Sequence, residues 1–274
     1  MSKIRAIKML GQNFLVDRSV VSRIVELVAP SPGDNILEIG PGQGAMTREL
    51  VASGANVVAV ELDRRLAPLL ANEFAGNDNF TVIEADILDT DLAELLGSSS
   101  GSPWKVAANL PYNISSQVLL KFLDTPQLFS HLVLMLQKEV GDRLAAPPAC
   151  KEYGILTLFS RLHFDVCREF IVKPGAFHPV PKVDSAVLSF RPLTKPRADV
   201  GDELLFRRVV KAAFNQRRKT LWNCLRSANL LDGSEQLAKV MSTCAIDPGR
   251  RGETLSLEEF ATLTRGILAA KGST

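Results

Sequence analysis

The sequence predicts an α/β protein with a doubly wound, mostly parallel sheet, followed by a small helical domain. From Asn35 to about Gln137, short apolar runs alternate with segments of helical periodicity. This alternation implies parallel βαβ units. A linker is expected at Arg191–Gly201, where two prolines and four charged residues interrupt the pattern, and the rest of the chain has helical periodicity. We therefore predict one domain over residues 1–191 and a helical domain over residues 202–274.

Seven apolar runs have the length and composition of buried strands: Ile36–Ile39, Val57–Val60, Thr81–Ile83, Val106–Ala108, Leu132–Leu136, Asp165–Val172 and Ala186–Phe190. Helices are expected at Ala45–Ala52, Arg64–Phe74, Asp202 to about Asn229, Ser234–Ser242 and from Ser256 onward. Ser256-Leu257-Glu258-Glu259 has the pattern of a capping box, which marks a helix start. The composition of Gly97–Pro103 favours a surface loop.

Composition excludes several classes of protein. The 274 residues are 46% hydrophobic and 23% charged, as in soluble globular proteins. No apolar run reaches membrane-spanning length, and Met1–Arg5 lacks the apolar core of a signal peptide, so a cytoplasmic location is expected. We also expect the protein to be a monomer. The scattered four cysteines and three histidines suggest neither a disulfide framework nor a metal site.

Charge is distributed unevenly along the chain. Residues 1–180 carry 16 Lys and Arg against 20 Asp and Glu, whereas residues 181–274 carry 16 against 10. The C-terminal part is thus net positive by six charges on a chain whose overall charge is only +2. A basic region of this kind favours a polyanionic partner.

A glycine-rich loop follows the first predicted strand. Glu38–Gly44 has the spacing G-x-G-x-G, which differs from the dinucleotide and P-loop patterns. Glu61 ends the second strand, where a carboxylate can accept hydrogen bonds from both hydroxyls of a ribose. Asp86 follows the third strand, where an adenine amino group would lie. Each feature alone could be a tight turn or a solvated acid. Their order at successive strand ends favours a nucleoside, and an acid in the first loop favours a cationic amino end. S-adenosylmethionine has these groups.

Asn109-Leu110-Pro111-Tyr112 closes another predicted strand, and ligands of open α/β sheets bind at such strand ends. Asn109 can present an amide oxygen, and Pro111 favours an extended Leu110 whose carbonyl is free to face a cleft. Tyr112 adds a flat ring. Two acceptors and a ring suit the amino group of a base, although an ordinary strand-ending turn remains the alternative for these four residues by themselves.

Six ordered motifs span nearly the whole chain: Leu10–Leu15, Glu38–Gly44, Asn109–Ser115, Phe177–Ser185, Phe214–Leu221 and Gly252–Ser256. Together they resemble the small-subunit ribosomal RNA adenine dimethyltransferases, the KsgA/RsmA family. The resemblance implies a class I S-adenosylmethionine-dependent methyltransferase fold with about seven strands. It also implies N6,N6-dimethylation of two adjacent adenosines in the 3′-terminal hairpin of 16S rRNA, within the immature small ribosomal subunit.

The resemblance also implies roles for individual residues. Asn13 and Leu15 would help to close the cofactor pocket, which Gly40, Glu61, Asp86 and Asn109 would line. Phe177 would lie across the target base from Tyr112, although core packing remains the alternative for Phe177.

Two other functions remain open. Dimethylases of large-subunit RNA share the N-terminal motifs, so these motifs do not separate the two groups. Gln216–Leu221 and Gly252–Ser256 favour the small-subunit group. The other possibility is a ribosome-assembly factor that acts mainly by binding.

These residues suggest a mechanism for methyl transfer to an amino nitrogen. The Asn109 side-chain oxygen and the Leu110 carbonyl would accept hydrogen bonds from the two N–H groups of the amino nitrogen. These bonds would draw the nitrogen toward tetrahedral geometry. The protein would position the nitrogen and stabilise developing positive charge, without a general base. Stacking on Tyr112 and Phe177 would offset the cost of unstacking the target base.

The predicted helix from Asp202 carries a basic face. On a wheel of about 100° per residue, six cations share a sector opposite the apolar residues: Arg207, Arg208, Lys211, Arg218, Lys219 and Arg226. Arg217 departs from the pattern, which indicates an interruption near Asn215. A solvated face is the simple explanation. The positive charge of this region favours a face that contacts RNA phosphates, to which we assign Arg207, Arg208, Lys211, Arg217, Arg218 and Lys219.

Overall fold

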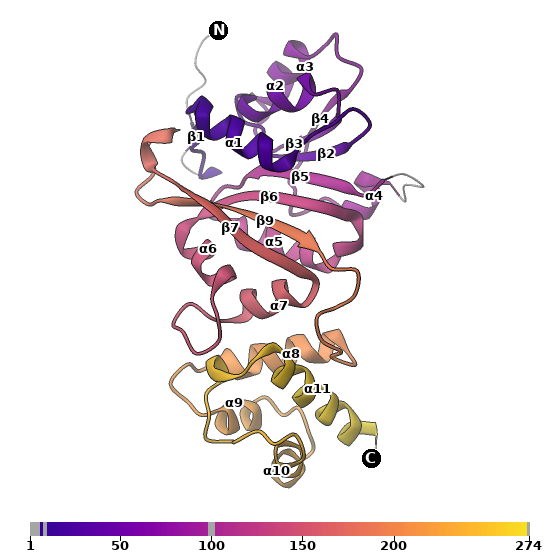
Figure 1. Ribbon diagram of the computed structural model, residues 1–274, viewed down its shortest axis with the longest axis vertical. Helices are drawn as coiled ribbons and strands as arrows, with labels where there is room; N and C mark the ends of the chain where they lie inside the picture. Colours follow the sequence, from indigo (N-terminus) through magenta and orange to yellow (C-terminus); the bar gives the residue numbers. More distant parts are fainter. Residues whose placement is uncertain (1–5, 8–9, 98–101, 273–274) are drawn as a thin grey trace. The chain divides into compact units, whose positions relative to one another are not determined.

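A computed structural model describes residues 6–7, 10–97 and 102–272. The chain forms two compact units (Figure 1). The N-terminal unit comprises Met1–Gly141 and Phe164–Pro192, and the C-terminal unit comprises Asp142–His163 and Leu193–Thr274. Residues 142–163 thus pack with the C-terminal unit, whereas the sequence analysis grouped them with the first 191 residues. The assignment of methyl transfer to one part and RNA binding to the other stays a prediction.

The N-terminal unit is built on a seven-stranded sheet, and all seven predicted strands are confirmed (Figure 1). Its order is β4-β3-β2-β5-β6-β9-β7. The first five of these strands pair in parallel, and β9 pairs antiparallel with both β6 and β7. The bounds are β2 Asn35–Ile39, β3 Asn56–Glu61, β4 Phe80–Glu84, β5 Trp104–Asn109, β6 Phe129–Gln137, β7 Phe164–Val172 and β9 Ser185–Pro192.

Helices connect the strands of this unit. Their bounds are α1 Arg18–Val28, α2 Ala45–Ala52, α3 Ala67–Glu73, α4 Leu92–Leu96 and α5 Ser115–Asp124, and α6 Lys138–Ala145 crosses the boundary into the second unit. The predicted helices at 45–52 and 64–74 correspond to α2 and α3. Helix α1 was not predicted from the sequence; its N-cap Asp17 accepts from the amides of Ser19 and Val20.

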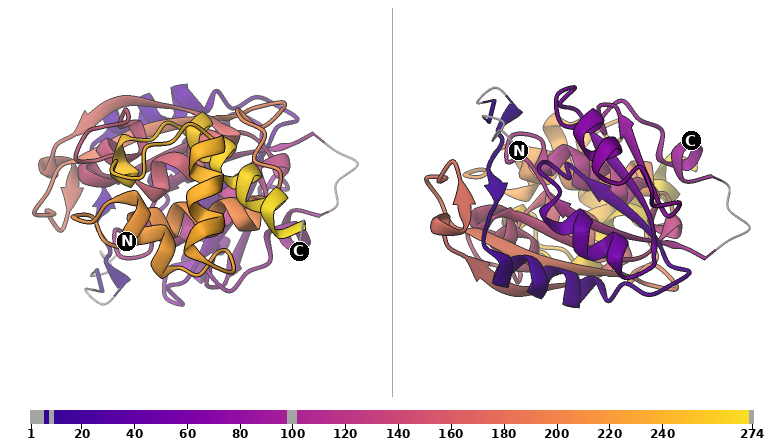
Figure 2. Two further views of the ribbon diagram at one scale, coloured as in Figure 1. Left: turned by 90° about the horizontal axis from the view of Figure 1, so that it is seen from below. Right: turned by 90° about the horizontal axis from the view of Figure 1, so that it is seen from above.

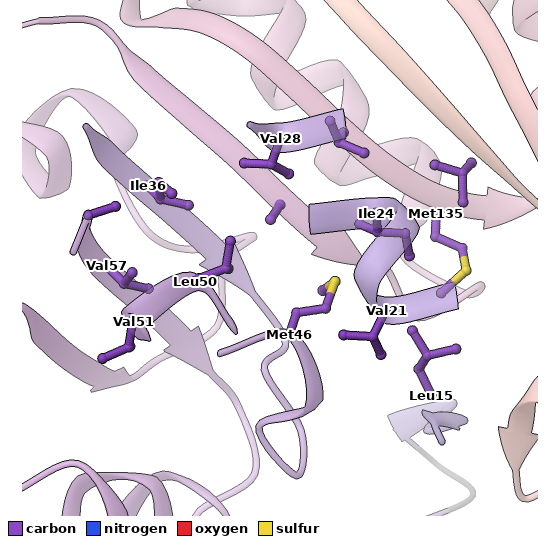
Figure 3. Close-up of a cluster of buried hydrophobic side chains, with 14 of the residues drawn as sticks. Leu15, Val21, Ile24, Val28, Ile36, Met46, Leu50, Val51, Val57 and Met135 are labelled. Atoms are coloured by element: carbon purple, nitrogen blue, oxygen red, sulfur yellow. The ribbon is translucent and has the colours of Figure 1, made fainter. Parts of the chain in front are cut away.

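One face of the sheet packs against α1 and α2. Val21, Ile24 and Val28 of α1 and Met46 and Leu50 of α2 meet apolar side chains of the strands in one buried cluster (Figure 3). Apolar residues recur at helical spacing on α1, which places them on one stripe. Burial of Met46 and Leu50 in the same cluster holds α2 against the sheet. The position of α2 in turn fixes the glycine loop from which this helix begins.

A two-stranded ribbon lies beside the main sheet. In it β1, Phe14–Leu15, pairs antiparallel with β8, Phe177–His178. The ribbon joins segments that are far apart in sequence, and a 3-10 turn at Pro174–Ala176 precedes β8. It therefore sets the position of the N-terminal segment beside Phe177–His178.

The C-terminal unit consists of helices (Figure 2). Their bounds are α7 Ile155–His163, α8 Glu203–Phe214, α9 Leu221–Ser227, α10 Ser234–Thr243 and α11 Leu257–Gly272. At the start of α11 the Ser256 amide donates to Glu259 Oε2 at 2.8 Å and the Glu259 amide donates to Ser256 Oγ at 3.2 Å. The predicted capping box is thereby confirmed.

The single helix predicted from Asp202 to about Asn229 is wrong, because α8 ends at Phe214 and α9 begins at Leu221. Thr220 has extended backbone angles and its hydroxyl caps α9 by accepting from the Asn223 amide. A cap of this kind begins a new helix and cannot continue the old one. The predicted interruption near Asn215 is confirmed, and the cations of 218–226 do not share one helix face with those of α8.

Two predictions concern residues that lie partly or wholly outside the described ranges. Met1–Arg5 and most of the predicted loop at Gly97–Pro103 lie outside the described residues. Within the described ranges, none of the helices combines the length and apolar composition that crossing a bilayer requires.

Candidate active site

Two adjoining cavities lie where strands β2, β3 and β5 end. Of the predicted residues, the first is lined by Asn13, Gly40, Glu61, Asn109, Leu110 and Tyr112. The second is lined by Gly40, Glu61 and Asp86. Because Gly40 and Glu61 line both cavities, the two cavities share a wall. The structure thus brings together most of the residues that the sequence analysis selected.

The glycine loop connects β2 to α2. Gly40, Gly42 and Gly44 have φ angles of 63°, 59° and 76°, in the left-handed region that favours glycine. A Cβ at Gly40 would meet no atom closer than the Asn109 carbonyl oxygen at 4.0 Å. The missing side chain therefore leaves open space between the loop and the end of β5.

Glu61 connects the loop to the end of β3. Its Oε2 accepts from the Gly42 amide at 2.9 Å and its Oε1 accepts from the Asp63 amide at 2.8 Å. Burial raises the pKa of Glu61, and these backbone amides oppose that rise. The Leu62 amide also opposes the rise, so backbone amides on two sides hold the carboxylate at the cavity wall.

Asp63 fastens the N-terminal segment to this wall. Its Oδ2 accepts from Gln12 Nε2 at 2.9 Å, and Arg65 holds the pKa of Asp63 at about 2, with a smaller contribution from Gln12. Gln12 in turn accepts from the Ile7 amide at 2.7 Å. These bonds therefore hold Gln12 in place, and Gln12 lines both cavities.

Asp86 follows β4 and lines the second cavity. Its Oδ1 accepts from the Leu88 amide at 2.8 Å, which fixes the carboxylate. Within the described ranges Oδ2 has no hydrogen-bond partner, so it can accept from a ligand. Ile87, 4% exposed, supplies an apolar wall beside it.

Asn109 ends β5 in a fixed orientation. Its Nδ2 donates to the Asn13 backbone oxygen at 3.1 Å. A carbonyl oxygen can only accept, so the amide nitrogen must face Asn13 and the amide oxygen must face away from it. Asn109 therefore presents Oδ1 as an acceptor in a cavity that both residues line.

Leu110 and Tyr112 complete this wall. The Leu110 amide donates to the Met135 carbonyl at 3.2 Å and its side chain is 1% exposed, whereas its own carbonyl accepts no hydrogen bond from a described residue. The Tyr112 hydroxyl is bonded to Ser185 Oγ at 2.7 Å, and burial raises its pKa. A free carbonyl and an anchored aromatic ring thus accompany the Asn109 amide.

Two predicted residues lie elsewhere. Phe177 is 2% exposed and Leu15 is 7% exposed, and both belong to the core cluster beneath α1. Neither lines one of these two cavities. The structure therefore places the Tyr112 ring at the cavity but holds the Phe177 ring in the core.

The predicted RNA-binding residues differ in exposure. Arg208, Lys211, Arg218 and Lys219 are exposed. Arg207 is half-buried, with its guanidinium 5.3 Å from the centre of the Phe159 ring. Arg217 is also exposed, but it forms an ion pair with Glu253 at 3.5 Å and donates to the Lys151 carbonyl. The first four side chains are thus the more accessible to a polyanion.

Several cavity residues were not selected from the sequence. Gly11, Gln12, Phe14, Gly42 and Pro111 line the first cavity, and Leu62, Ile87 and Ile114 are among the residues that line the second. Most lie in or next to the motifs already quoted, so their proximity in sequence was the available signal. Their individual orientation depends on tertiary contacts.

Comparison with known proteins agrees with this geometry. A family model for ribosomal RNA adenine dimethylase matches residues 3–267. The chain is 63% identical to a ribosomal RNA small subunit methyltransferase A of Geobacter sulfurreducens, over 98% of each protein. It is 46% identical to the protein of the same name from Clostridium acetobutylicum, over 95% of this chain and 93% of that protein.

Solved structures have the same architecture. A dimethyladenosine transferase from Plasmodium falciparum superposes with a TM-score of 0.79 at 22% identity, covering 94% of this chain and 98% of that one. The 23S rRNA methyltransferase ErmE superposes with a TM-score of 0.68 at 25% identity, covering 93% and 99%. The predicted class I methyltransferase fold with a helical C-terminal part is confirmed.

The family match also confirms the predicted activity class, an enzyme that dimethylates adenine in ribosomal RNA, which implies an rRNA substrate and a methyl donor of the S-adenosylmethionine type. The chain belongs to the ribosomal RNA adenine dimethylase family.

Proposed function

We propose that this protein uses S-adenosylmethionine to dimethylate N6 of two adjacent adenosines in the 3′-terminal hairpin of 16S rRNA. The observation that carries the proposal is the orientation of Asn109. Because Nδ2 is held by the Asn13 carbonyl, Oδ1 is available to accept, in the cavity that the Leu110 backbone also lines. Two acceptors at one strand end match the two N–H groups of an adenine amino group.

The residues of the two cavities fit the methyl donor. The space at Gly40 admits a ligand close to the backbone, and the Glu61 carboxylate, oriented by the Gly42 and Asp63 amides, can accept hydrogen bonds from a ribose diol. Asp86 Oδ2 can accept from the adenine amino group of the cofactor. We therefore assign the cofactor to Gly40, Glu61, Asp86, Asn109 and Asn13, with Leu15 supporting the wall from the core.

When bound, S-adenosylmethionine supplies an electrophilic methyl group on a sulfonium. Asn109 Oδ1 and the Leu110 carbonyl accept the two N–H bonds of the target amino group and direct its lone pair out of the ring plane. Positioning of this kind lowers the entropic cost of bringing the two reactants together in the correct orientation. The same two oxygens stabilise the positive charge that develops on the nitrogen.

Tyr112 supports the target base by stacking. Its hydroxyl bond to Ser185 fixes the ring, and base–aromatic stacking is worth about 1–3 kcal/mol. Phe177 as the second stacking ring stays a prediction, and its role requires a rotamer change that brings the ring out of the core when RNA binds.

The RNA is held by the exposed cations Arg208, Lys211, Arg218 and Lys219, with smaller roles for Arg207 and Arg217. We assign the substrate to rRNA within the immature small subunit, bound by a monomer in the cytoplasm. The names of the two relatives, both small-subunit methyltransferases, support this choice over large-subunit RNA.

Mass spectrometry of rRNA fragments tests the substrate. Small subunits that lack the modification are incubated with the protein and S-adenosylmethionine, and large subunits serve as the control. We expect two adjacent dimethyladenosines in the 3′-terminal hairpin and none in the large subunit. Modification of large-subunit RNA alone would refute the proposal.

Replacement of Asn109 tests the acceptor pair. Asn109→Ala removes Oδ1, and we expect methyl incorporation to fall by at least about 100-fold, the effect typical of removing one electrostatic interaction with a transition state. RNA affinity, measured by filter binding, should stay within about twofold because the phosphate contacts that dominate affinity are intact. Methyl transfer near the wild-type rate would contradict the assignment.

A further inference from the structure

Two apolar side chains are exposed on the loop between β8 and β9. Val180 is 64% exposed and Val183 is 45% exposed. Large apolar side chains this accessible need a reason when they lie on a functional surface. The loop, residues 179–184, is called here the valine loop.

Both ends of the valine loop contact the wall of the candidate active site. At its start, His178 of β8 pairs with Phe14, which lines the first cavity. At its end, Ser185 is bonded to the Tyr112 hydroxyl at 2.7 Å, and Tyr112 lines the same cavity. The loop therefore borders the place assigned to the target adenine.

Local contacts hold the valine loop in shape. Pro181 is buried between the exposed residues Val180 and Lys182. Asp184 pairs with Lys173 at 2.8 Å, and its carbonyl accepts from the Lys138 amide at 2.9 Å. A loop fixed at both ends and in the middle gives up little further entropy when its apolar side chains contact a ligand.

The charge around the two valines suits nucleic acid. Lys182 lies between them and is exposed, and the Lys173 side chain is 78% exposed beside Asp184. An apolar tip flanked by cations can contact the faces of bases while the cations contact the adjoining phosphates. A purely apolar partner would offer no anion to Lys182, whereas Lys173 already pairs with Asp184.

We propose that Val180 and Val183 pack against the stacked bases that the target adenine leaves, filling its place and holding it in the active site. The inference rests on the proposed function. A flipped base gives up its stacking at a cost of a few kcal/mol. Other nucleic-acid-binding proteins insert apolar side chains at base steps, and an apolar side chain in the place of an extruded base regains contact with the neighbouring bases. The valine loop thus acts on the RNA next to the target, while Asn109, Leu110 and Tyr112 act on the target itself.

The test replaces both valines by threonine, which keeps their shape and adds a hydroxyl. In Val180→Thr/Val183→Thr we expect kcat/KM on unmodified small subunits to fall roughly tenfold, because a polar wedge packs less favourably against the bases. A hairpin RNA with 2-aminopurine at the target position reports unstacking directly. Its fluorescence at saturating protein should rise with the wild type and rise much less with the variant.

Leu69→Thr is the matched control, because Leu69 is 49% exposed on α3 of the same unit and borders neither cavity. This variant should match the wild type in both measurements. Val180→Ile/Val183→Ile keeps both side chains apolar, so it should retain both the wild-type kcat/KM and the fluorescence rise. Unchanged fluorescence and kcat/KM in the threonine variant, or no rise with the wild type, would overturn the inference. Failure of the wild type to methylate small subunits would instead overturn the proposed function.

Discussion

At the residue scale, Glu38 is a buried acid that the proposed chemistry does not use directly. It is 0% exposed on β2, and neither carboxylate oxygen has a hydrogen-bond partner among the described residues. Burial raises its pKa to about 8, and the charge of Glu61 adds to this effect. The nearby Thr47 hydroxyl opposes it, although no Thr47–Glu38 contact meets hydrogen-bond geometry.

This pKa makes the stability of the N-terminal unit depend on pH. Between pH 4.5 and about 8 the folded chain keeps a proton on Glu38 that the unfolded chain releases, so the free energy of unfolding falls as pH rises. Each pKa unit is worth about 1.4 kcal/mol, so the decrease amounts to several kcal/mol. Glu38→Gln mimics the protonated form and should remove this dependence.

Urea unfolding at pH 5 and pH 8 measures the effect. A Trp222→Phe background leaves Trp104 of β5 as the fluorescent reporter of the N-terminal unit. We expect Glu38→Gln to gain stability relative to the wild type as pH rises. A difference that is the same at both pH values would show that Glu38 is ionised in the folded chain.

Gly40 allows a sharper test of the cofactor space. Gly40→Ala places a Cβ in the open space near the Asn109 carbonyl, and we expect affinity for S-adenosylmethionine to fall by at least about tenfold because steric overlap replaces close approach of the backbone. Gly33→Ala is the control, since Gly33 has a φ of 89° and its added Cβ would meet nothing within 4 Å. Isothermal titration calorimetry measures both, and equal affinities would contradict the assignment.

At the scale of elements, strands were the most predictable part. The strands β2, β3, β5, β6 and β9 are largely buried, and continuous apolar runs of this kind are recognisable in a sequence, whereas β4 and β7 are more exposed. The capping box of α11 was also readable, because Ser256 and Glu259 interact within one turn. The length of the helix from Asp202 could not be predicted, because its end at Phe214 depends on tertiary contacts. Thr220 caps a new helix, and Gly252 packs so closely against the Ala213 carbonyl that a Cβ at Gly252 would lie 2.7 Å from that oxygen.

The break between α8 and α9 changes the expected RNA interface. Lys211 lies on α8 and Arg218 in the connecting turn, so they are expected to bind separate phosphates. We expect Lys211→Glu/Arg218→Glu to weaken RNA binding and to reduce the salt slope by roughly 0.7–0.9 for each phosphate that is no longer neutralised. Lys271→Glu, at the end of α11, is the matched control. Binding measured from low to high salt with no change in slope would refute the assignment.

At the scale of the whole molecule, the sequence placed Asn109, Gly40, Glu61 and Asp86 correctly at one edge of the sheet. Parallel strands end at the same edge, so position in sequence was enough. The orientation of Asn109 could not be predicted, because it depends on Asn13, 96 residues away. The burial of Phe177 depends likewise on its pairing with Leu15 and on the packing of α1 over the sheet.

The β1–β8 ribbon and the Tyr112–Ser185 bond have a consequence for synthesis of the chain. Phe14 and Leu15 gain their strand partners only when residues 177–178 exist, and Tyr112 gains its anchor only at residue 185. Contacts between such distant segments form late. A nascent chain that ends before residue 185 therefore carries all the residues of the acceptor wall without their final arrangement. We therefore expect methyl transfer only from chains that extend beyond residue 185.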